Sequence, residues 1–328
     1  MAKPYAQTTD AFEWNPAFLP LYENISKAVV GKEEVVRLVL VSLLAGGHCL
    51  IEDVPGVGKT VLVRAVARTL GCEFRRIQFT PDLLPSDVTG TSIYNQKTQE
   101  FEFRPGPIFG QVVLADEINR TSPKTQSALL EAMEEQGVSA DGQRHELPQP
   151  FFVLATENPI DFEGTFPLPE AQLDRFLLKL SMGYPSLADE MAILDRQQKQ
   201  NPIDQLEPIA GPDDVLEWRR QRADVYVETA LREYLVRIVQ ATRAHNSVYL
   251  GASPRASLAL FKAAQALALL SGRTFVVPDD IRYLAPYVLE HRILLTPDAR
   301  LSGVQTKLLI LELVDSVPVP MPKGATWR

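Results

Sequence analysis

A glycine-rich loop carries the most specific chemistry in this sequence. It reads Asp53-Val-Pro-Gly-Val-Gly-Lys-Thr60 and lies between an apolar run and a helical pattern at residues 61–70. In such a loop, consecutive backbone N–H groups point at a phosphate chain, and the positive end of the following helix favours the same anion. Lys59 would reach the β- and γ-phosphates, and the Thr60 hydroxyl would bind Mg²⁺. The loop therefore predicts a nucleotide site.

The loop departs in one position from the pattern of Gly, four residues, then Gly-Lys-Ser/Thr, because Asp53 replaces the first glycine. Gly56 and Gly58 still give the backbone the freedom it needs, and Pro55 helps to fix the bend, so we expect the phosphate cradle to form. The predicted nucleotide-binding residues of this segment are Pro55, Gly56, Val57, Gly58, Lys59, Thr60 and Val61.

Two carboxylates, Asp116 and Glu117, follow the apolar run at residues 111–115. In an enzyme with a loop of this kind, the aspartate holds the metal ion directly or through water, and the glutamate can polarise the water that attacks the γ-phosphate. The predicted metal ligands are therefore Thr60 and Asp116, and the predicted general base is Glu117.

An amide and a guanidinium group complete the set of candidates. Asn158 follows the apolar run at residues 151–156, so its amide would lie at the same edge of a parallel sheet and orient the attacking water. Arg175 precedes the last apolar run, and an arginine directed at the γ-phosphate accelerates hydrolysis by about 10³–10⁵. A surface ion pair with Asp174 or Glu170 is the alternative for Arg175.

Short apolar runs alternate with helical patterns from about residue 30 to 181, which is typical of an α/β domain with a mainly parallel sheet. The five candidate strands are residues 48–52, 74–78, 111–116, 151–156 and 176–180. Two further segments read as β-hairpins, residues 92–103 around a polar centre and residues 138–147 with a turn at Asp141-Gly142.

Beyond a turn-rich stretch at residues 183–186 the pattern becomes helical. The candidate helices are residues 186–200, 212–222, 229–244, 254–270 and 278–289, each with Pro, Ser or Thr at the start. We expect a small helical domain joined to the α/β domain by a hinge. A length of 328 residues agrees with two domains of about 150 residues each.

Charge and hydropathy exclude several classes of protein. Residues 1–185 hold 16 basic and 24 acidic side chains, and the remainder holds 17 of each. Neither part has the excess of basic residues that is typical of a protein that binds nucleic acid independently of sequence. The longest mostly apolar run, residues 38–51, is too short to cross a bilayer, and no secretory signal is legible. Cys49 and Cys72 are too few for a disulfide scaffold. We expect a cytoplasmic protein with no membrane insertion and no nucleic-acid partner.

A series of motifs in chain order resembles the MoxR-type members of the AAA+ ATPases, the branch that shares a helix-2 insertion with MCM helicases and magnesium-chelatase ATPase subunits. The resemblance covers roughly residues 20–320. The motifs are Val29-Val-Gly31, the loop from Glu52 to Thr60, Gln78-Phe-Thr-Pro-Asp-Leu-Leu-Pro-Ser-Asp87, Gly106-Pro-Ile-Phe109, Ala115-Asp-Glu-Ile-Asn-Arg120, Ala155-Thr-Glu-Asn-Pro159, Phe166-Pro-Leu-Pro-Glu-Ala-Gln-Leu-Asp-Arg-Phe176 and Gly251-Ala-Ser-Pro-Arg255.

The resemblance implies a role for each candidate. Lys59 and Thr60 belong to Walker A, Asp116 and Glu117 to Walker B, Asn158 to sensor 1, Arg175 to the arginine finger and Arg255 to sensor 2. Arg255 also starts a predicted helix, from which it could couple the position of the helical domain to the γ-phosphate, and its action within or between subunits stays open. Val29, Val30 and Gly31 would lie near the adenine.

The resemblance also implies an architecture. We expect a P-loop AAA+ core with a five-stranded parallel sheet between helices over residues 21–185, after an N-terminal extension at 1–20. A helical lid domain would follow over residues 186–328. The hairpins would be the helix-2 insert, about residues 89–104, and the hairpin before sensor 1, about residues 138–149.

The same resemblance implies the assembly and the activity. An arginine finger generally acts on the nucleotide of a neighbouring subunit, so we expect a ring, usually a hexamer, that binds ATP with Mg²⁺ between subunits. The cycle would drive chaperone-like remodelling or maturation of a partner, commonly together with a protein that has a von Willebrand factor A domain. Two alternatives remain, an ATP-dependent DNA translocase and a nucleotide-gated scaffold with little turnover. The sequence does not identify the client.

Overall fold

The computed structural model describes residues 12–140, 142–159, 165–198 and 201–320. The predicted extension at 1–20 therefore lies mostly outside the described residues. The first part of the chain holds α1 (Leu19–Ala28), α2 (Glu33–Ala45), β1 (Cys49–Glu52), α3 (Lys59–Thr69), β2 (Phe74–Gln78), α4 (Pro85–Thr89), β3 (Gly90–Asn95), β4 (Glu100–Pro105), η1 (Pro107–Phe109), β5 (Val112–Asp116), η2 (Ile118–Arg120), α5 (Pro123–Glu135), β6 (Gly137–Ala140), β7 (Gln143–Glu146), β8 (Phe152–Glu157), α6 (Glu170–Leu173) and β9 (Leu178–Leu180).

The second part of the chain is mainly helical. It holds α7 (Leu187–Gln197), η3 (Pro202–Gln205), α8 (Pro212–Asp224), α9 (Thr229–Ala244), β10 (Val248–Leu250), α10 (Pro254–Leu270), α11 (Pro278–Leu289), η4 (Glu290–Arg292), β11 (Leu294–Leu295), α12 (Pro297–Leu301) and α13 (Thr306–Ser316). The α9, α10 and α11 helices have the predicted bounds, and α10 and α11 begin with proline, whose fixed φ suits a first helical residue. The short pairing of β10 with β11 was not predicted.

The central sheet has the strand order β2-β5-β8-β1-β9, and all its strands run parallel. Gln78 pairs with Asp116, and Glu52 pairs with Glu157, so β1, β2, β5 and β8 end side by side. The loops that follow these strands meet at this carboxyl edge, where open α/β sheets bind their ligands. The predicted α/β class with a five-stranded parallel sheet and a following helical part is confirmed.

Helices cover the sheet on both faces. Cys49 and Ile51 of β1 enter one hydrophobic core with α2 and α3, whereas Leu50 between them enters the other core with α5. The central strand β5 is buried along its whole length. This burial explains why the strands read as continuous apolar runs in the sequence.

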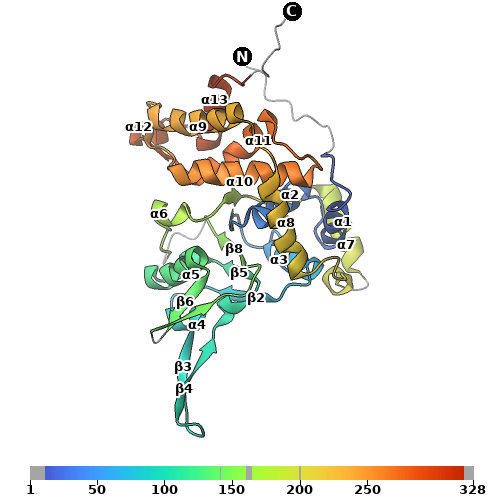
Figure 1. Ribbon diagram of the computed structural model, residues 1–328, viewed down its shortest axis with the longest axis vertical. Coiled ribbons are helices and arrows are strands. Elements are labelled where there is room, and N and C mark those ends of the chain that lie inside the picture. The colour runs from blue at the N-terminus through green and yellow to red at the C-terminus, as the bar shows by residue number, and fades with distance from the viewer. Residues whose placement is uncertain (1–11, 141, 160–164, 199–200, 321–328) are drawn as a thin grey trace, which may run out of the picture.

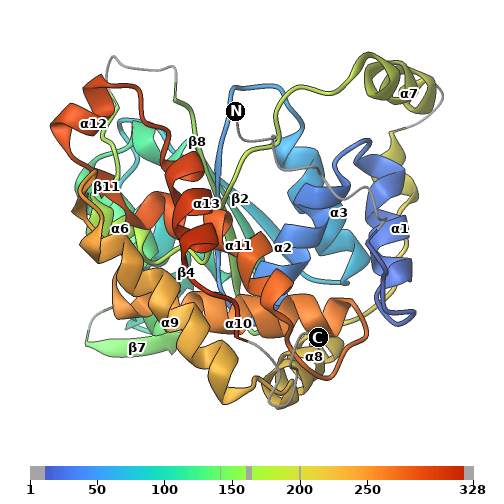
Figure 2. The same ribbon diagram turned by 90° about the horizontal axis from the view of Figure 1, so that it is seen from above.

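The later helices pack directly on the sheet domain, with α10 against α2 (Figure 1). Ala263 and Leu267 of α10 belong to the same hydrophobic core as Val36 and Leu40 of α2. The α7 helix lies apart from α9–α13 and beside α1 (Figure 2), where Arg196 donates to the carbonyl oxygens of Ser26 and Lys27. The division at residues 185 and 186 and the hinge there stay predictions.

Both predicted hairpins form. The β3 and β4 strands pair from Gly90–Pro105 to Asn95–Glu100 and project from the body of the molecule (Figure 1). The β6 and β7 strands also pair, although Asp141 of their predicted turn lies outside the described residues. Across the described part of the chain, no helix combines the length and the apolar character needed to cross a membrane.

Candidate nucleotide site

The glycine-rich loop joins β1 to α3 and borders a cavity. Gly56 and Gly58 have φ angles of 87° and 95°, a region that glycine adopts without steric cost. The cavity is lined by Pro55, Gly56, Gly58, Lys59, Thr60, Val61, Arg76, Gln78, Asp116 and Glu117. The structure thus brings most of the predicted loop residues and both predicted carboxylates together, whereas the Val57 side chain is buried in the core.

The ammonium group of Lys59 lies inside the loop. Its Nζ donates to the carbonyl oxygen of Asp53 at 2.7 Å. Burial lowers the pKa of Lys59 below its ordinary value, against the opposing effect of the negative charges on Asp116, Asp53 and Glu117. These charges favour the protonated lysine that a phosphate chain requires.

Asp116 ends β5 and is held by the strands on either side. Thr156 of β8 donates its hydroxyl to Asp116 Oδ1 at 2.7 Å, and Arg76 Nη2 of β2 donates to Asp116 Oδ2 at 2.6 Å. Because β5 pairs with both strands, the register of the sheet sets the position of this carboxylate.

Glu117 leaves the strand with a φ of 58°, a left-handed conformation that costs a non-glycine residue about 1–2 kcal/mol. Its N–H donates to Thr156 Oγ1 at 2.8 Å. Its carboxylate accepts hydrogen bonds from Gln78 Nε2 and Arg120 Nη1, both at 3.0 Å. These bonds hold a strained backbone in place, as is common where side chains do chemistry.

Asp53 has a structural reason to replace the first glycine of the loop. Its Oδ2 accepts the N–H groups of Met182 and Gly183 at 2.7 and 2.6 Å. It also accepts the Ser181 hydroxyl at 3.1 Å, and Oδ1 accepts the Val54 N–H at 2.9 Å. Burial raises the pKa of Asp53, but these hydrogen bonds outweigh burial and the pKa lies below its ordinary value. The side chain therefore ties the start of the loop to the segment after β9, which a glycine cannot do.

Asn158 follows β8 at the same edge of the sheet, but it is outside the set of residues that line the cavity. It is 5% exposed, and its carbonyl oxygen accepts Asn119 Nδ2 at 3.2 Å. The Asp53 N–H donates to the carbonyl oxygen of Glu157 at 3.2 Å, so the segment before Asn158 is next to the start of the loop.

The segment predicted to lie near the adenine borders the chain that follows β9. Val29 is buried in the core, and Gly31 has a φ of 67°. A Cβ atom on Gly31 would lie 2.3 Å from the Asp189 side chain, and one on Gly58 would lie 3.9 Å from Met182 Cε. The chain between Met182 and Asp189 thus reaches from the glycine-rich loop to Gly31.

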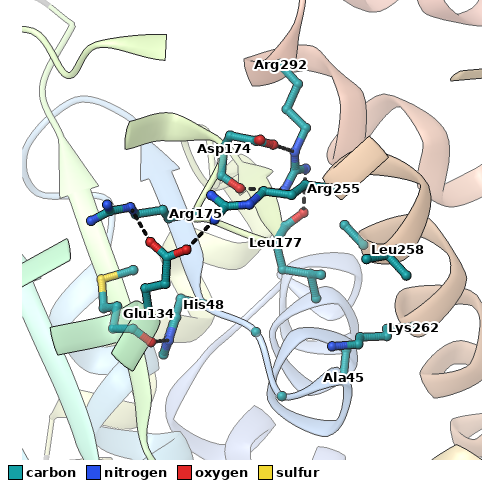
Figure 3. A pocket seen from close by; sticks show the side chains of 14 residues that line it. Ala45, His48, Glu134, Asp174, Arg175, Leu177, Arg255, Leu258, Lys262 and Arg292 are labelled. Atoms are coloured by element: carbon teal, nitrogen blue, oxygen red, sulfur yellow. Dashed lines mark hydrogen bonds and ion pairs between the residues drawn. The ribbon is translucent and has the colours of Figure 1, made fainter. Parts of the chain in front are cut away.

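Arg175 and Arg255 line a different cavity (Figure 3). Gly47 and His48, which precede β1, and Leu177, which precedes β9, also line it. Because these residues stand at the amino ends of parallel strands, the cavity lies at the opposite edge of the sheet from the glycine-rich loop. The structure does not bring these two arginines to the nucleotide cavity of their own chain.

The partners of Arg175 differ from the predicted alternative. Arg175 Nε lies 3.1 Å from Glu134 Oε2, and Arg255 Nη2 contacts Glu134 Oε1. Asp174 forms its ion pair with Arg292 instead, with 2.6 Å between Oδ1 and Nε. The alternative of a pair with Asp174 or Glu170 does not form, because the end of α5 supplies a carboxylate that is distant in sequence.

The sequence reasoning gave no role at the site to Arg76, Gln78, Thr156 or Glu134, although Gln78 and Thr156 lie within two of the quoted motifs. Arg76 and Gln78 are two residues apart on β2, so they face the same side of the sheet. The signal that identifies them is the pairing of β2 with β5, which places both beside Asp116. That pairing depends on the strand order and is not visible in one sequence.

Glu157 carries a carboxyl group that titrates near neutral pH. Burial raises its pKa from the ordinary 4.5 to about 7, Glu52 on the paired strand adds repulsion, and Lys179 acts in the opposite direction. At pH values between about 4.5 and about 7, the folded protein binds more protons than the unfolded chain. The free energy of unfolding therefore falls as the pH rises from about 4.5 to about 7.

We expect Glu157→Gln to raise the free energy of unfolding at pH 8 by up to about 3 kcal/mol and to change it little near pH 4. Urea denaturation of the variant and the wild type at both pH values measures the effect. Glu146→Gln, an exposed change on β7, is the matched control. Equal effects of Glu157→Gln at the two pH values would contradict the raised pKa.

Comparison with known proteins places this geometry in a family. The model described as "ATPase family associated with various cellular activities (AAA)" matches residues 48–178, and the model described as "AAA lid domain" matches residues 240–312. These two segments include the glycine-rich loop with the sheet and the α10–α13 region.

Full-length relatives agree with these matches. The chain is 58% identical to the uncharacterized protein YeaC of Bacillus subtilis, over 92% of this chain and 95% of that protein. It is 45% identical to the chaperone MoxR1 of Mycobacterium tuberculosis, over 90% and 81%, and 33% identical to the protein MoxR of Methylorubrum extorquens, over 94% and 96%. A crystal structure from Cytophaga hutchinsonii, 39% identical, superposes with a TM-score of 0.87 over 93% of this chain and 95% of that one.

Relatives that carry the MoxR name thus match nearly the whole chain, and the AAA model covers the cavity in which Lys59, Asp116 and Glu117 meet. The motif resemblance found in the sequence is confirmed by these matches. The protein belongs to the MoxR family of AAA ATPases.

Proposed function

We propose that this protein hydrolyses ATP in the cavity beside the glycine-rich loop and couples the hydrolysis to chaperone-like remodelling of a partner protein. The observation that carries the site is the meeting of Lys59, Asp116 and Glu117 in one cavity at the carboxyl edge of the sheet. The Asp53 side chain adds support, because it joins this loop to the segment that leads into the helical part.

Lys59 and the N–H groups at the start of α3 bind the β- and γ-phosphates in this proposal. The Thr60 hydroxyl and the Asp116 carboxylate provide oxygen ligands for Mg²⁺, which neutralises charge on the phosphates when bound. The described residues contain no group of three or more His, Cys, Asp and Glu side chains able to hold a metal. This donor set still fits Mg²⁺, which takes one or two protein ligands and completes its shell with phosphate oxygens and water.

Glu117 then accepts a proton from the attacking water, and Asn158 orients that water. Thr156 supports both carboxylates of this site, since its hydroxyl oxygen accepts the Glu117 N–H and its O–H donates to Asp116. The sheet register thereby controls the separation of the metal ligand from the base.

The arginines complete the site of a neighbouring subunit in this proposal. Arg175 and Arg255 lie at the amino edge of the sheet, whereas the glycine-rich loop lies at the carboxyl edge. A head-to-tail contact between two copies brings one edge to the other, and such contacts close into a ring. We propose a hexameric ring with ATP between subunits, Arg175 as the finger and Arg255 as the sensor, both acting in trans.

The partner protein is proposed from the similarity of this chain to the MoxR family. The Mycobacterium tuberculosis relative bears the name chaperone, and the motif resemblance implies action together with a protein that has a von Willebrand factor A domain. We propose the same kind of partner here, in the cytoplasm. Purification of the native complex with ATP, followed by mass spectrometry, tests this, and complexes that lack any such protein would contradict the proposed partner.

We expect Lys59→Ala to weaken ATP binding by roughly 10- to 100-fold, because a buried charge-assisted contact to phosphate is lost. Fluorescent-nucleotide titration measures affinity, and phosphate release with Mg²⁺ and after chelation measures turnover. Lys97→Ala, an exposed change in the β3–β4 turn, is the control. Unchanged affinity in Lys59→Ala would place the nucleotide elsewhere.

A further inference from the structure

One carboxylate contacts both arginines of the amino-edge cavity. Glu134, near the end of α5, has its Oε2 3.1 Å from Arg175 Nε and its Oε1 against Arg255 Nη2 (Figure 3). Arg175 follows α6 and Arg255 lies in the first turn of α10, so the two side chains come from separate parts of the chain. Glu134 is thus one of the points at which a charged side chain of the sheet domain contacts the later helices.

The other carboxylate of this cavity has different partners. Asp174 binds Arg292 and accepts the Ser253 hydroxyl at 2.9 Å. Arg292 is 8% exposed and also donates to the carbonyl oxygens of Phe176 and Leu177. This pair holds the segment before β9 against the later helices, whereas Glu134 contacts the two arginines assigned to the neighbouring nucleotide.

The contact leaves donors on both arginines for a second anion. Arg175 forms an ion pair with Glu134 in which its inner nitrogen Nε lies 3.1 Å from Oε2 without making a hydrogen bond, so Glu134 does not use the N–H donors of Arg175. Arg255 uses one terminal amino group, Nη2, which leaves Nη1 and Nε for other contacts. Two guanidinium groups against one carboxylate also leave a net positive charge, which suits a triphosphate.

We propose that Glu134 is a positioning residue that holds Arg175 and Arg255 in one shared orientation for the γ-phosphate of the neighbouring subunit. This inference rests on the proposed function, in which both arginines act across the subunit boundary. Free arginine side chains have many rotamers, and fixing two of them before the phosphate arrives removes an ordering cost from the reaction. The two side chains are 27% and 53% exposed, so packing alone leaves them room to move.

We expect Glu134→Ala to lower kcat about 10- to 100-fold, because small displacements of a charge-stabilising group have effects of this size. The KM for ATP should stay within about twofold, because the variant's own glycine-rich loop is unchanged. Glu135→Ala, a change at the next, exposed position of α5, is the matched control and should keep wild-type turnover. A merely structural role would lower the melting temperature without separating kcat from KM.

Mixing experiments test whether the loss of turnover in Glu134→Ala arises in the subunit that supplies the arginines or in the subunit that binds the nucleotide. Glu134→Ala mixed with Lys59→Ala should recover activity, because the Lys59→Ala subunit supplies an intact set of arginines. Glu134→Ala mixed with Arg175→Ala should not recover, because both changes damage the same side. Recovery in the second mixture, or a Glu134→Ala variant faster than wild type, would overturn the inference.

The same mixtures separate this inference from the proposed ring. If Lys59→Ala and Arg175→Ala subunits co-assemble and fail to restore activity, the trans arrangement fails and the role of Glu134 fails with it. If that pair restores activity while Glu134→Ala behaves like wild type, the inference about Glu134 fails and the proposed ring stands.

Discussion

Glu117→Gln is expected to release phosphate about 10²–10⁴-fold more slowly than the wild type, the range that a positioned general base contributes. Glutamine keeps the size and the hydrogen-bonding oxygen of the side chain but cannot take a proton from water. The contacts of Glu117 with Gln78 and Arg120 can largely persist through that oxygen. ATP affinity should therefore change little, which distinguishes this variant from Lys59→Ala.

Steady-state phosphate release and fluorescent-nucleotide titration measure these two quantities on the same samples. Glu100→Gln, an exposed change on β4, is the control for loss of a negative charge. Equal and negligible rates in the wild type and in Glu117→Gln would favour a nucleotide-gated scaffold over an enzyme. A measurable wild-type rate that the variant loses supports the proposed role of Glu117.

The parts of the structure that sequence could predict are those set by local pattern. The glycine-rich loop with Lys59 and Thr60 was found because the groups that would bind phosphate are consecutive in the sequence. The α9, α10 and α11 helices were placed to the residue because helical periodicity and an initial proline or threonine act over one or two turns. The carboxylates at the end of β5 were found because an apolar strand leads directly into them.

The parts that sequence could not predict depend on packing between distant segments. The position of Arg175 in the sequence indicated a phosphate contact, but the location of its cavity follows from the register of β9 beside β1 and from the packing of α10 on α2. Glu134 reads in sequence as an ordinary acidic residue of an amphipathic helix. Its contacts with two arginines appear when α5, α6 and α10 are assembled.

Arg175→Ala is expected to lower ATP turnover by about 10³–10⁵ in a ring of identical variant subunits, the range known for arginines that stabilise charge on a transferred phosphoryl group. Such a loss corresponds to roughly 4–7 kcal/mol of barrier. ATP affinity of each subunit should be nearly unchanged, because Arg175 lies at the opposite edge of the sheet from the glycine-rich loop.

The decisive form of this prediction mixes Arg175→Ala with Lys59→Ala subunits, each of which should turn over little alone at an ATP concentration that saturates the wild type but not Lys59→Ala. In a random ring of equal parts, about a quarter of the sites combine an intact loop with an intact arginine from the neighbour, so about a quarter of wild-type turnover should return. The control mixes Arg175→Ala with wild type, where about half the sites should remain active. Native mass spectrometry verifies that mixed rings form. The structure separates Lys59 from Arg175 by the length of the sheet strands, so a site completed within one chain would need a large rearrangement. If mixed rings form and activity does not recover, the proposal that Arg175 acts on the neighbouring subunit is contradicted.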